Sequence, residues 1–204
     1  MYISSLQKFY LSNNYPIIID RKEIARLMNE YYKNNNKYNE LVSCEIGVQS
    51  GSFSNQILQE FSLVDKHILV DCWKEQSRDV YNDAANRNDQ EQENTYNSCL
   101  NNLKSFKNKI DIIRKMSDDA CLDICDNYLD YLYIDGNHSY EAVKNDLNNW
   151  YPKMKKNSII SGHDYVKTPI FGVIQAVDEF CVKHKLDLFL TQNPKENISW
   201  FIFL

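Results

Sequence analysis

Four ionisable side chains stand where predicted strands end, and residues of these types can bind a metal ion or move a proton. The four are Asp135, His138, His163 and Asp164. Carboxylates and imidazoles ligate divalent cations, and an unperturbed histidine changes its charge near neutral pH. Taken singly, each has an ordinary explanation, because Asp135 and Ser139 could merely cap a helix and the histidines could be plain loop residues. Their joint placement favours a functional site.

The elements around these residues predict that they meet. An apolar run, Tyr131 to Ile134, precedes the first pair, a helix follows Ser139, and the apolar run Ile159-Ile160 precedes the second pair. Two strands joined by a helix of this length lie parallel, since a parallel connection needs a crossover of about a dozen residues or more. Their carboxyl ends then lie at one edge of the sheet, where open α/β sheets bind ligands. We therefore expect an active-site rim at that edge.

A glycine turn earlier in the chain predicts a second part of the site. The apolar run Leu41 to Ile46 contains Glu45 and leads into Gly47 and Gly51, after which a helix begins. Glycines let the backbone approach a ligand closely, and a helix N-terminus offers free N–H groups. The spacing E-x-G-x-x-x-G differs from the G-x-G-x-x-G of dinucleotide-binding folds, and an acid here would repel a pyrophosphate. The turn suits a ligand that carries an amine or a hydroxyl.

The next predicted strand, His67 to Val70, ends in Asp71. An acid at the end of the second strand, roughly twenty residues past the first glycine turn, is placed to accept both hydroxyls of a ribose. Trp73 follows and could cover a flat ring. The polar stretch from Glu75 to Glu93 has no apolar period, so it is predicted to be a mobile loop or a lid.

Two helix starts are predicted from capping patterns, at Asp20-x-x-Glu23 and at Asp89-x-x-Gln92. The first opens an N-terminal helix that covers one edge of the domain or a partner subunit, and nothing in it indicates chemistry. At the other end of the chain, the runs Leu186 to Leu190 and Ile198 to Phe203 are joined by a short turn. They predict an antiparallel pair at the sheet edge.

The composition is that of an ordinary globular protein. With 204 residues, 43% hydrophobic and 25% charged, the chain fits one domain, and disorder can be set aside. No apolar run is long enough to span a bilayer and the start, MYISSLQKFY, lacks a secretory pattern, so a cytoplasmic location is expected. The net charge of -5 argues against nucleic acid as a substrate, since phosphate binding shows as a basic face.

The cysteines do not predict a disulfide framework. The chain has 6 of them, scattered mostly through apolar segments, which suits buried reduced thiols. Cys121 and Cys125 have a tolerable spacing for zinc, but no second close pair accompanies them. A structural metal at this pair is therefore disfavoured.

Four segments in chain order, CEIGVQSGSF, VDCW, YIDGNHSYEAVKNDL and IISGHDY, resemble the class I S-adenosylmethionine-dependent methyltransferases. Within them the chain is similar to the group that includes macrolide-sugar O-methyltransferases and cephalosporin-hydroxylase-like proteins. The resemblance covers residues 41 to 203, and its most specific part is Asp135 to Glu141 followed by His163-Asp164-Tyr165.

This resemblance implies an α/β, Rossmann-like fold. Its seven-stranded, mostly parallel sheet has an antiparallel last strand and helices on both faces. We expect one methyltransferase domain over residues 1–204, made of an N-terminal helical extension, 1–40, and a Rossmann-like core, 41–204.

The matching motifs also imply a site for S-adenosylmethionine. The residues implied to bind it are Glu45, Gly47, Ser50, Gly51, Asp71, Trp73, Ser117, Asp118 and Asp135. In metal-dependent relatives an acid at the position of Asp135 and two acids at the positions of His163 and Asp164 bind magnesium. Because His163 departs from that pattern and imidazole favours softer ions, magnesium and manganese both stay open as the metal.

The expected activity is methyl transfer to a hydroxyl of a small molecule or a sugar. Such a transfer requires an acceptor oxygen in line with the methyl group and removal of its proton. Asp135, His163 and Asp164 would hold a divalent ion, and His138 or His163 would act as the base, with Asp135 completing the catalytic set.

Three other activities stay open on the sequence. They are a nicotinamide-dependent oxidoreductase, a non-catalytic binding or scaffolding domain of the same fold, and a hydroxylase-like enzyme of the resembled group. Turnover of the cofactor to S-adenosylhomocysteine with a hydroxylated acceptor would separate them. The sequence does not identify the acceptor, and it does not determine whether the protein forms a homo-oligomer.

Overall fold

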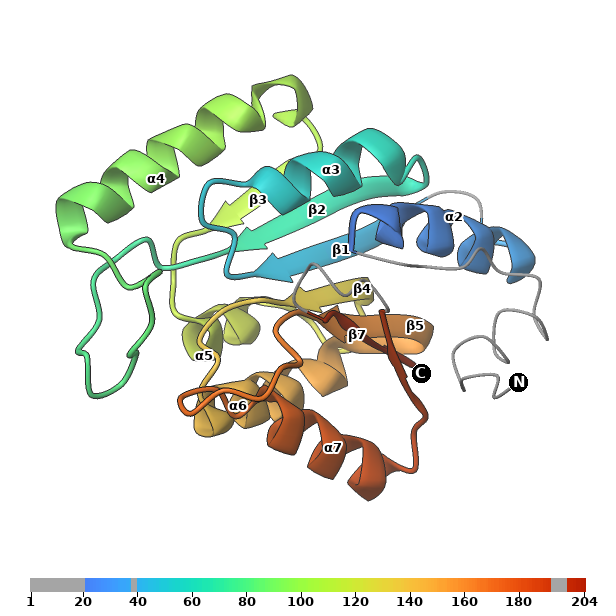
Figure 1. The fold of residues 1–204 in the computed structure, drawn as a ribbon. Helices are drawn as coiled ribbons and strands as arrows, with labels where there is room; N and C mark the ends of the chain where they lie inside the picture. Colours follow the sequence, from blue (N-terminus) through green and yellow to red (C-terminus); the bar gives the residue numbers. More distant parts are fainter. Residues whose placement is uncertain (1–20, 38–39, 192–197) are drawn as a thin grey trace.

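The computed structural model describes residues 21–37, 40–191 and 198–204. Within these ranges strands and helices alternate (Figure 1). In chain order the elements are η1 (Arg21–Glu23), α2 (Ile24–Asn34), β1 (Leu41–Ile46), α3 (Ser52–Glu60), β2 (Val64–Val70), α4 (Asp89–Asn102), η2 (Lys104–Phe106), β3 (Ile110–Ile113), α5 (Ser117–Ala120), η3 (Cys121–Asp123), β4 (Leu129–Ile134), α6 (Tyr140–Trp150), η4 (Tyr151–Lys153), β5 (Met154–Gly162), α7 (Val173–His184), β6 (Leu188–Leu190) and β7 (Trp200–Phe203).

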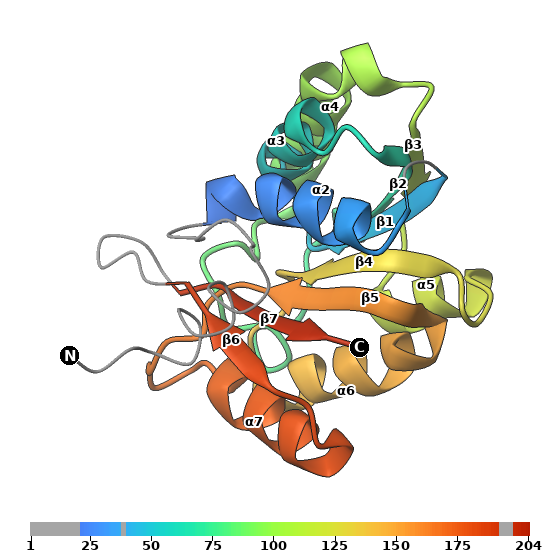
Figure 2. The same cartoon turned by 90° about the vertical axis from the view of Figure 1, so that its right-hand side faces the viewer.

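One sheet of seven strands runs through the middle of the fold in the order β3-β2-β1-β4-β5-β7-β6 (Figure 2). The first five strands of that order pair in parallel, and β7 pairs antiparallel with both β5 and β6. The α/β class, the antiparallel last strand and the C-terminal edge pair are therefore confirmed. β6 and β7 are shorter than their predicted runs, whereas β2, β4 and β5 are longer.

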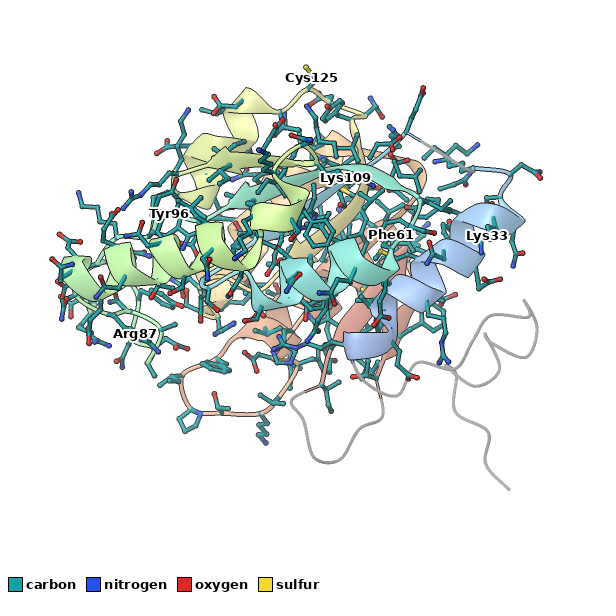
Figure 3. All side chains as sticks on the ribbon, turned by 90° about the horizontal axis from the view of Figure 1, so that it is seen from above. Lys33, Phe61, Arg87, Tyr96, Lys109 and Cys125 are labelled. Atoms are coloured by element: carbon teal, nitrogen blue, oxygen red, sulfur yellow. The ribbon has the colours of Figure 1, made fainter. Side chains whose placement is uncertain are left out.

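Helices cover both faces of the sheet, as expected (Figures 1 and 2). α2, α3 and α4 lie side by side over one face, with Phe61 at the end of α3 and Tyr96 on α4 (Figure 3). Side chains of a strand alternate between the faces, so Tyr131 and Tyr133 enter the core beneath α2 and α3, and Leu132 enters the core beneath α6 and α7. Every residue of β4 is buried, which is typical of a central parallel strand.

The N-terminal helix α2 is fixed to the sheet through Asp130, at the opposite edge from the predicted site. Its predicted apolar stripe is buried: Ile24, Leu27, Met28 and Tyr31 are between 0 and 7% exposed. The Tyr32 hydroxyl donates to the Asp130 carbonyl, and the Lys37 ammonium lies 3.1 Å from the Asp130 carboxylate. The predicted cap at Asp20 lies outside the described residues. With α2 fixed, Arg21 in η1 keeps a definite place beside the sheet.

The start of α4 differs from its prediction by one residue. The N-cap is Asn88, whose side chain accepts from the Glu91 N–H at 2.9 Å, while the Glu91 carboxylate accepts from the Asn88 N–H at 3.3 Å. Asp89 is the first helical residue instead of the cap. Both registers satisfy the same capping pattern, and the reciprocal pair is formed only by the earlier one.

The segment between β2 and α4 is shorter than the predicted loop, since residues 89–93 belong to the helix. Its interior is organised by Asn86, which is 0% exposed. The Asn86 amide accepts from the Gln76 N–H at 2.9 Å and donates to the carbonyls of Gln76 and Tyr81 at 2.8 and 2.9 Å. Arg78 donates to two further carbonyls of the segment, those of Asp83 and Asn86. We call residues 75–88 the cover segment.

Gly47 is required where the glycine turn crosses the end of β4. Its φ is +85°, and a Cβ there would lie 2.1 Å from the Asp135 carbonyl oxygen. Gly47→Ala is expected to lower the free energy of unfolding by at least about 2 kcal/mol, through this overlap and the strained backbone. Urea unfolding measures it. Gly136→Ala is the matched control, because its Cβ would meet Ile46 at an ordinary 3.5 Å; an equal loss in both variants would contradict the argument.

Candidate active site

A cavity of about 540 Å³ opens at the carboxyl edge of the sheet, beside the ends of β1, β2 and β4. Its walls include Gly47, Asp71, Met116, Ser117, Asp135 and Asp146. They come from the glycine turn, three strand ends and α6, so the parallel arrangement of the strands creates this concavity. Five of the residues implied to bind the cofactor line it: Gly47, Asp71, Ser117, Asp118 and Asp135.

Asp71 stands in the middle of this wall, directly after β2. One carboxylate oxygen accepts from the Gln49 N–H at 2.9 Å and the other from the Trp73 N–H at 2.8 Å. Burial raises the pKa of Asp71, against the opposite effect of these N–H donors. Both oxygens keep a further lone pair. Two adjacent hydroxyls of a ligand in the cavity could therefore be accepted together.

Four of the implied cofactor residues are not part of the cavity wall: Glu45, Ser50, Gly51 and Trp73. Glu45 alternates with Cys44 and Ile46, so it faces α3, where the Ser54 hydroxyl donates to its carboxylate and His67 Nε2 lies 3.9 Å away. Burial raises the pKa of Glu45.

The other three belong to the packing around α3 and α4. The Trp73 ring does not cover the cavity, because its N–H donates to the Gln49 carbonyl and its centre lies 4.9 Å from the centre of the Tyr96 ring. A Cβ on Gly51 would touch Cys99 and Leu103, and the Ser50 carbonyl accepts from Asn102. These residues support the glycine turn on the side that faces away from the cavity.

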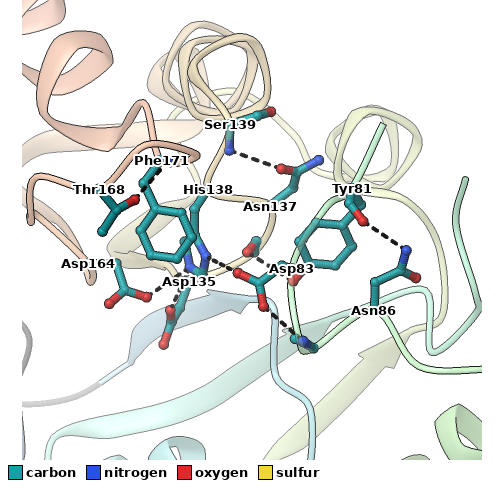
Figure 4. A network of polar contacts seen from close by, with 12 residues as sticks. Tyr81, Asp83, Asn86, Asp135, Asn137, His138, Ser139, Asp164, Thr168 and Phe171 are labelled. Carbon is teal, nitrogen blue, oxygen red and sulfur yellow. Dashed lines mark hydrogen bonds and ion pairs between the residues drawn. The ribbon is translucent and has the colours of Figure 1, made fainter. Parts of the chain in front are cut away.

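The four rim residues come together, as the sequence predicts. Ile134 and Gly162 are direct partners in the β4–β5 pairing, so Asp135 and His163 leave the sheet side by side. His138 Nε2 lies 3.3 Å from an Asp135 oxygen and 3.2 Å from an Asp164 oxygen (Figure 4). His163 Nδ1 is farther away, at 3.8 and 3.5 Å from oxygens of the same two carboxylates.

The donor atoms of Asp135, His138 and Asp164 all lie within 4.8 Å of one another. Two carboxylates and one imidazole form a donor set that suits a divalent ion of the manganese, iron or zinc kind, and magnesium through the oxygens. Among the described residues, this cluster contains His138, whereas the set predicted from the sequence contains His163 beside Asp135 and Asp164. The difference is geometric, because the His138 ring lies beside both carboxylates (Figure 4).

The second nitrogen of His138 faces the cover segment. Nδ1 lies 3.2 Å from an Asp83 oxygen, and the ring packs against Phe171 with 4.6 Å between ring centres (Figure 4). Burial alone would lower the pKa of His138, but the hydrogen bond and charge of Asp135, the charge of Asp164 and the hydrogen bond to Asp83 raise it to about 9. In the absence of an ion the imidazole therefore keeps its proton at neutral pH.

Two residues of the site were missed by sequence reasoning. Arg21 lies 3.2 Å from the other Asp135 oxygen and over the Phe53 ring, so the N-terminal extension supplies a cation to the rim. The expectation that this helix lacks chemistry is thus incomplete. Asp83 belongs to a segment recognised only as a lid. No local signal marks either one, because each acquires its role through a partner far along the chain.

The cysteines match their prediction. All six are free thiols, and Cys121 Sγ donates to the Asp118 carbonyl at 3.0 Å while Cys125 is exposed.

A family model described as "Methyltransferase domain" matches residues 44–165, which is more than half of the chain. Among curated proteins, the uncharacterized protein y4gI of Sinorhizobium fredii is 42% identical over 65 residues. Those residues are 31% of this chain and 7% of that protein, so the chain spans only a small part of that relative.

Two solved structures illustrate the likeness of the fold. The O-methyltransferase NovP is 21% identical with a TM-score of 0.62, covering 88% of this chain and 78% of that one. A SAM-dependent O-methyltransferase from Thermotoga maritima is 11% identical with a TM-score of 0.56, covering 98% of this chain and 71% of that one. The matched family, the strand order and the cavity at the strand ends agree: the chain belongs to the methyltransferase domain family and is an enzyme with the fold of the S-adenosylmethionine-dependent methyltransferases.

Proposed function

We propose that the enzyme transfers the methyl group of S-adenosylmethionine to a hydroxyl of a small molecule or a sugar, with a divalent ion at Asp135, His138 and Asp164. One observation supports this most directly: the cluster of donor atoms adjoins the cavity, and Asp135 belongs to both. An acceptor at the rim would then lie beside the methyl-bearing end of a cofactor in the cavity. The resemblance to O-methyltransferases agrees with an oxygen acceptor.

Each residue of the site has a role that follows from its position. Asp71 accepts the ribose hydroxyls, Gly47 lets the backbone approach the methionine end, and Ser117 and Asp118 lie at the adenine end. A bound divalent ion would contact the acceptor hydroxyl and lower its pKa. Asp83 orients the His138 ring from the far side, an arrangement typical of histidines that ligate metals.

Arg21 contributes a fixed positive charge at the rim. Its ion pair with Asp135 at 3.2 Å offsets the repulsion among the acidic residues gathered there. His163 is close enough to both carboxylates to exchange a proton with an acceptor bound beside them. We assign it the role of base when His138 binds the ion.

The reaction is tested by incubating the protein with S-adenosylmethionine, manganese or magnesium, and panels of sugars and phenols. Formation of S-adenosylhomocysteine together with an acceptor heavier by one methyl group supports the proposal. A hydroxylated product without S-adenosylhomocysteine would favour the hydroxylase-like activity, and cofactor binding without any turnover would favour a binding domain. Within the described ranges, no helix combines the length and apolar character needed to cross a bilayer; a cytoplasmic location stays a prediction.

Asp71→Ala is expected to weaken binding of S-adenosylhomocysteine by about 1.5 to 3 kcal/mol, the range for hydrogen bonds to a charged group. The variant loses the acceptor for the ribose and the anchor of the Gln49 N–H. Calorimetric titration measures the change. Asp79→Ala is the control, since Asp79 also lines the cavity but is exposed, and it should stay within about threefold of the wild type. Unchanged affinity in a folded Asp71→Ala variant would remove the ribose assignment.

A further inference from the structure

Asp146 is a buried carboxylate in the wall of the cavity, away from the metal cluster. It lies on α6, is 5% exposed, and faces the end of the cavity formed by Met116 and Ser117. Carboxylates are seldom buried without a cation or several N–H donors, because removing the charge from water is costly. The proposed reaction gives Asp146 no role, and a ligand in the cavity could supply the donor that its carboxylate lacks.

The side chain is held in one orientation by its neighbours. The buried Trp150 N–H donates to the Ser117 hydroxyl oxygen at 2.8 Å, and the Ser117 hydroxyl donates its proton to one Asp146 oxygen. A hydroxyl has a single proton to donate, so the Ser117 side chain has none left for a ligand. Among the described residues, Ser117 is the one hydrogen-bond donor to the Asp146 carboxylate, and it reaches only one of the two oxygens. The other oxygen is the acceptor that remains for an occupant of the cavity.

The surroundings define the kind of ligand that fits. Met116 and Ala142 provide apolar surface in the same wall, and Asn145 provides an amide. A flat ring that carries an N–H donor on its edge would pack on the apolar surface and reach the free oxygen. Burial raises the pKa of Asp146 to about 7, so a donated hydrogen bond would also stabilise its ionised form.

We propose that Asp146 binds the exocyclic amino group of the adenine, and that Trp150 and Ser117 position it for this purpose. The inference rests on the proposed use of S-adenosylmethionine. It changes the part of Ser117, which the resemblance implied to bind the cofactor and which here acts through Asp146. It also makes Asp146, on α6, the residue that distinguishes adenine from a purine with a keto oxygen at the same position.

The test compares S-adenosylhomocysteine with S-inosylhomocysteine, in which a keto oxygen replaces the amino group and the adjacent ring nitrogen carries a proton, by calorimetric titration. At pH 9, where Asp146 is ionised despite its raised pKa, the wild type should prefer the adenine compound by roughly tenfold or more, because the keto oxygen of the inosine compound would face the Asp146 carboxylate without a proton between them. Asp146→Asn should lose most of this preference, since its amide can donate to the keto oxygen. Glu141→Gln is the matched control, an exposed acid of the same helix and the same cavity wall, and should keep the preference.

The test measures the ratio of the two affinities because a purely structural role of Asp146 would change both affinities and leave their ratio unchanged. If Asp146→Asn retains the wild-type ratio, the assignment is overturned, whatever happens to the absolute affinities. Should that variant fail to fold, Ser117→Ala decides, because a misoriented Asp146 must reduce the ratio and an unchanged ratio would overturn the proposal. A wild type that binds the inosine compound as well as the adenine compound removes only this assignment. A wild type that binds neither removes the proposed function as well.

Discussion

Asp164→Asn is expected to lower divalent-ion-dependent methyl transfer by roughly a hundredfold or more, while affinity for S-adenosylhomocysteine stays within about threefold. Asp164 is 7% exposed and lies 3.2 Å from His138 Nε2, so it faces the rim cluster, and it is not part of the cavity wall. Its φ of 56° lies in the left-handed region, which asparagine also tolerates. The substitution therefore removes a charge without forcing the backbone to move.

Initial rates with and without added ions measure the effect, and calorimetric titration measures cofactor affinity. A chelator should reproduce the loss in the wild type, and manganese should restore activity at least as well as magnesium, because an imidazole belongs to the donor set. Full activity of the wild type in excess chelator would exclude the ion. Equal losses of rate and cofactor affinity would place Asp164 in the cofactor site instead.

His138→Ala is expected to reduce the rate by about a hundredfold or more. Its imidazole is the group that lies between the two carboxylates, at 3.3 and 3.2 Å, with Asp83 on its other nitrogen. Without it the ion loses a ligand, and three acidic side chains are left facing one another. Ion affinity, measured by titration with manganese, should fall together with the rate.

The second histidine of the rim is the matched control for ion binding. His163→Ala should keep most of the ion affinity, because its ring is farther from the carboxylates, whereas Asp83→Asn should weaken ion binding by about tenfold through loss of ring orientation. The reverse order would return His163 to the ligand set. If His138 instead acts as a base without an ion, it must first lose its proton, so its pKa of about 9 requires the reaction rate to rise with pH up to about 9. The rate should then be unaffected by chelators.

The sequence predicts the fold closely because its signals are local. Apolar runs that stop at Asp71, Asp135 and His163 mark strand ends, and strands joined by helices must run parallel, so the edge where these residues meet follows from chain geometry. The short C-terminal turn determines the antiparallel pair for the same reason. The alternation of side chains along β1 also explains a miss, because it turns Glu45 toward α3 and away from the cavity.

The remaining parts of the site depend on contacts between distant segments. Arg21 and Asp135 are separated by 114 positions and Asp83 and His138 by 55, and neither pairing leaves a pattern in the neighbouring residues. Asp146 occupies a helix position that sequence periodicity assigns to the buried face without stating what surrounds it. The choice between His138 and His163 as a ligand depends on the direction of one loop, which spacing alone does not determine.

The cover segment has a consequence for how enzymes of this kind diverge. Its backbone is held largely by its own side chains, Asn86 and Arg78, and it touches the chemistry through Asp83 and through the Tyr81 and Val80 contacts with the loop after β4. A segment built in this way can be exchanged as one cassette between the end of β2 and the start of α4, without rebuilding the sheet. Grafting cassettes from relatives offers a route to new acceptors, provided that each graft keeps an acid in the place of Asp83.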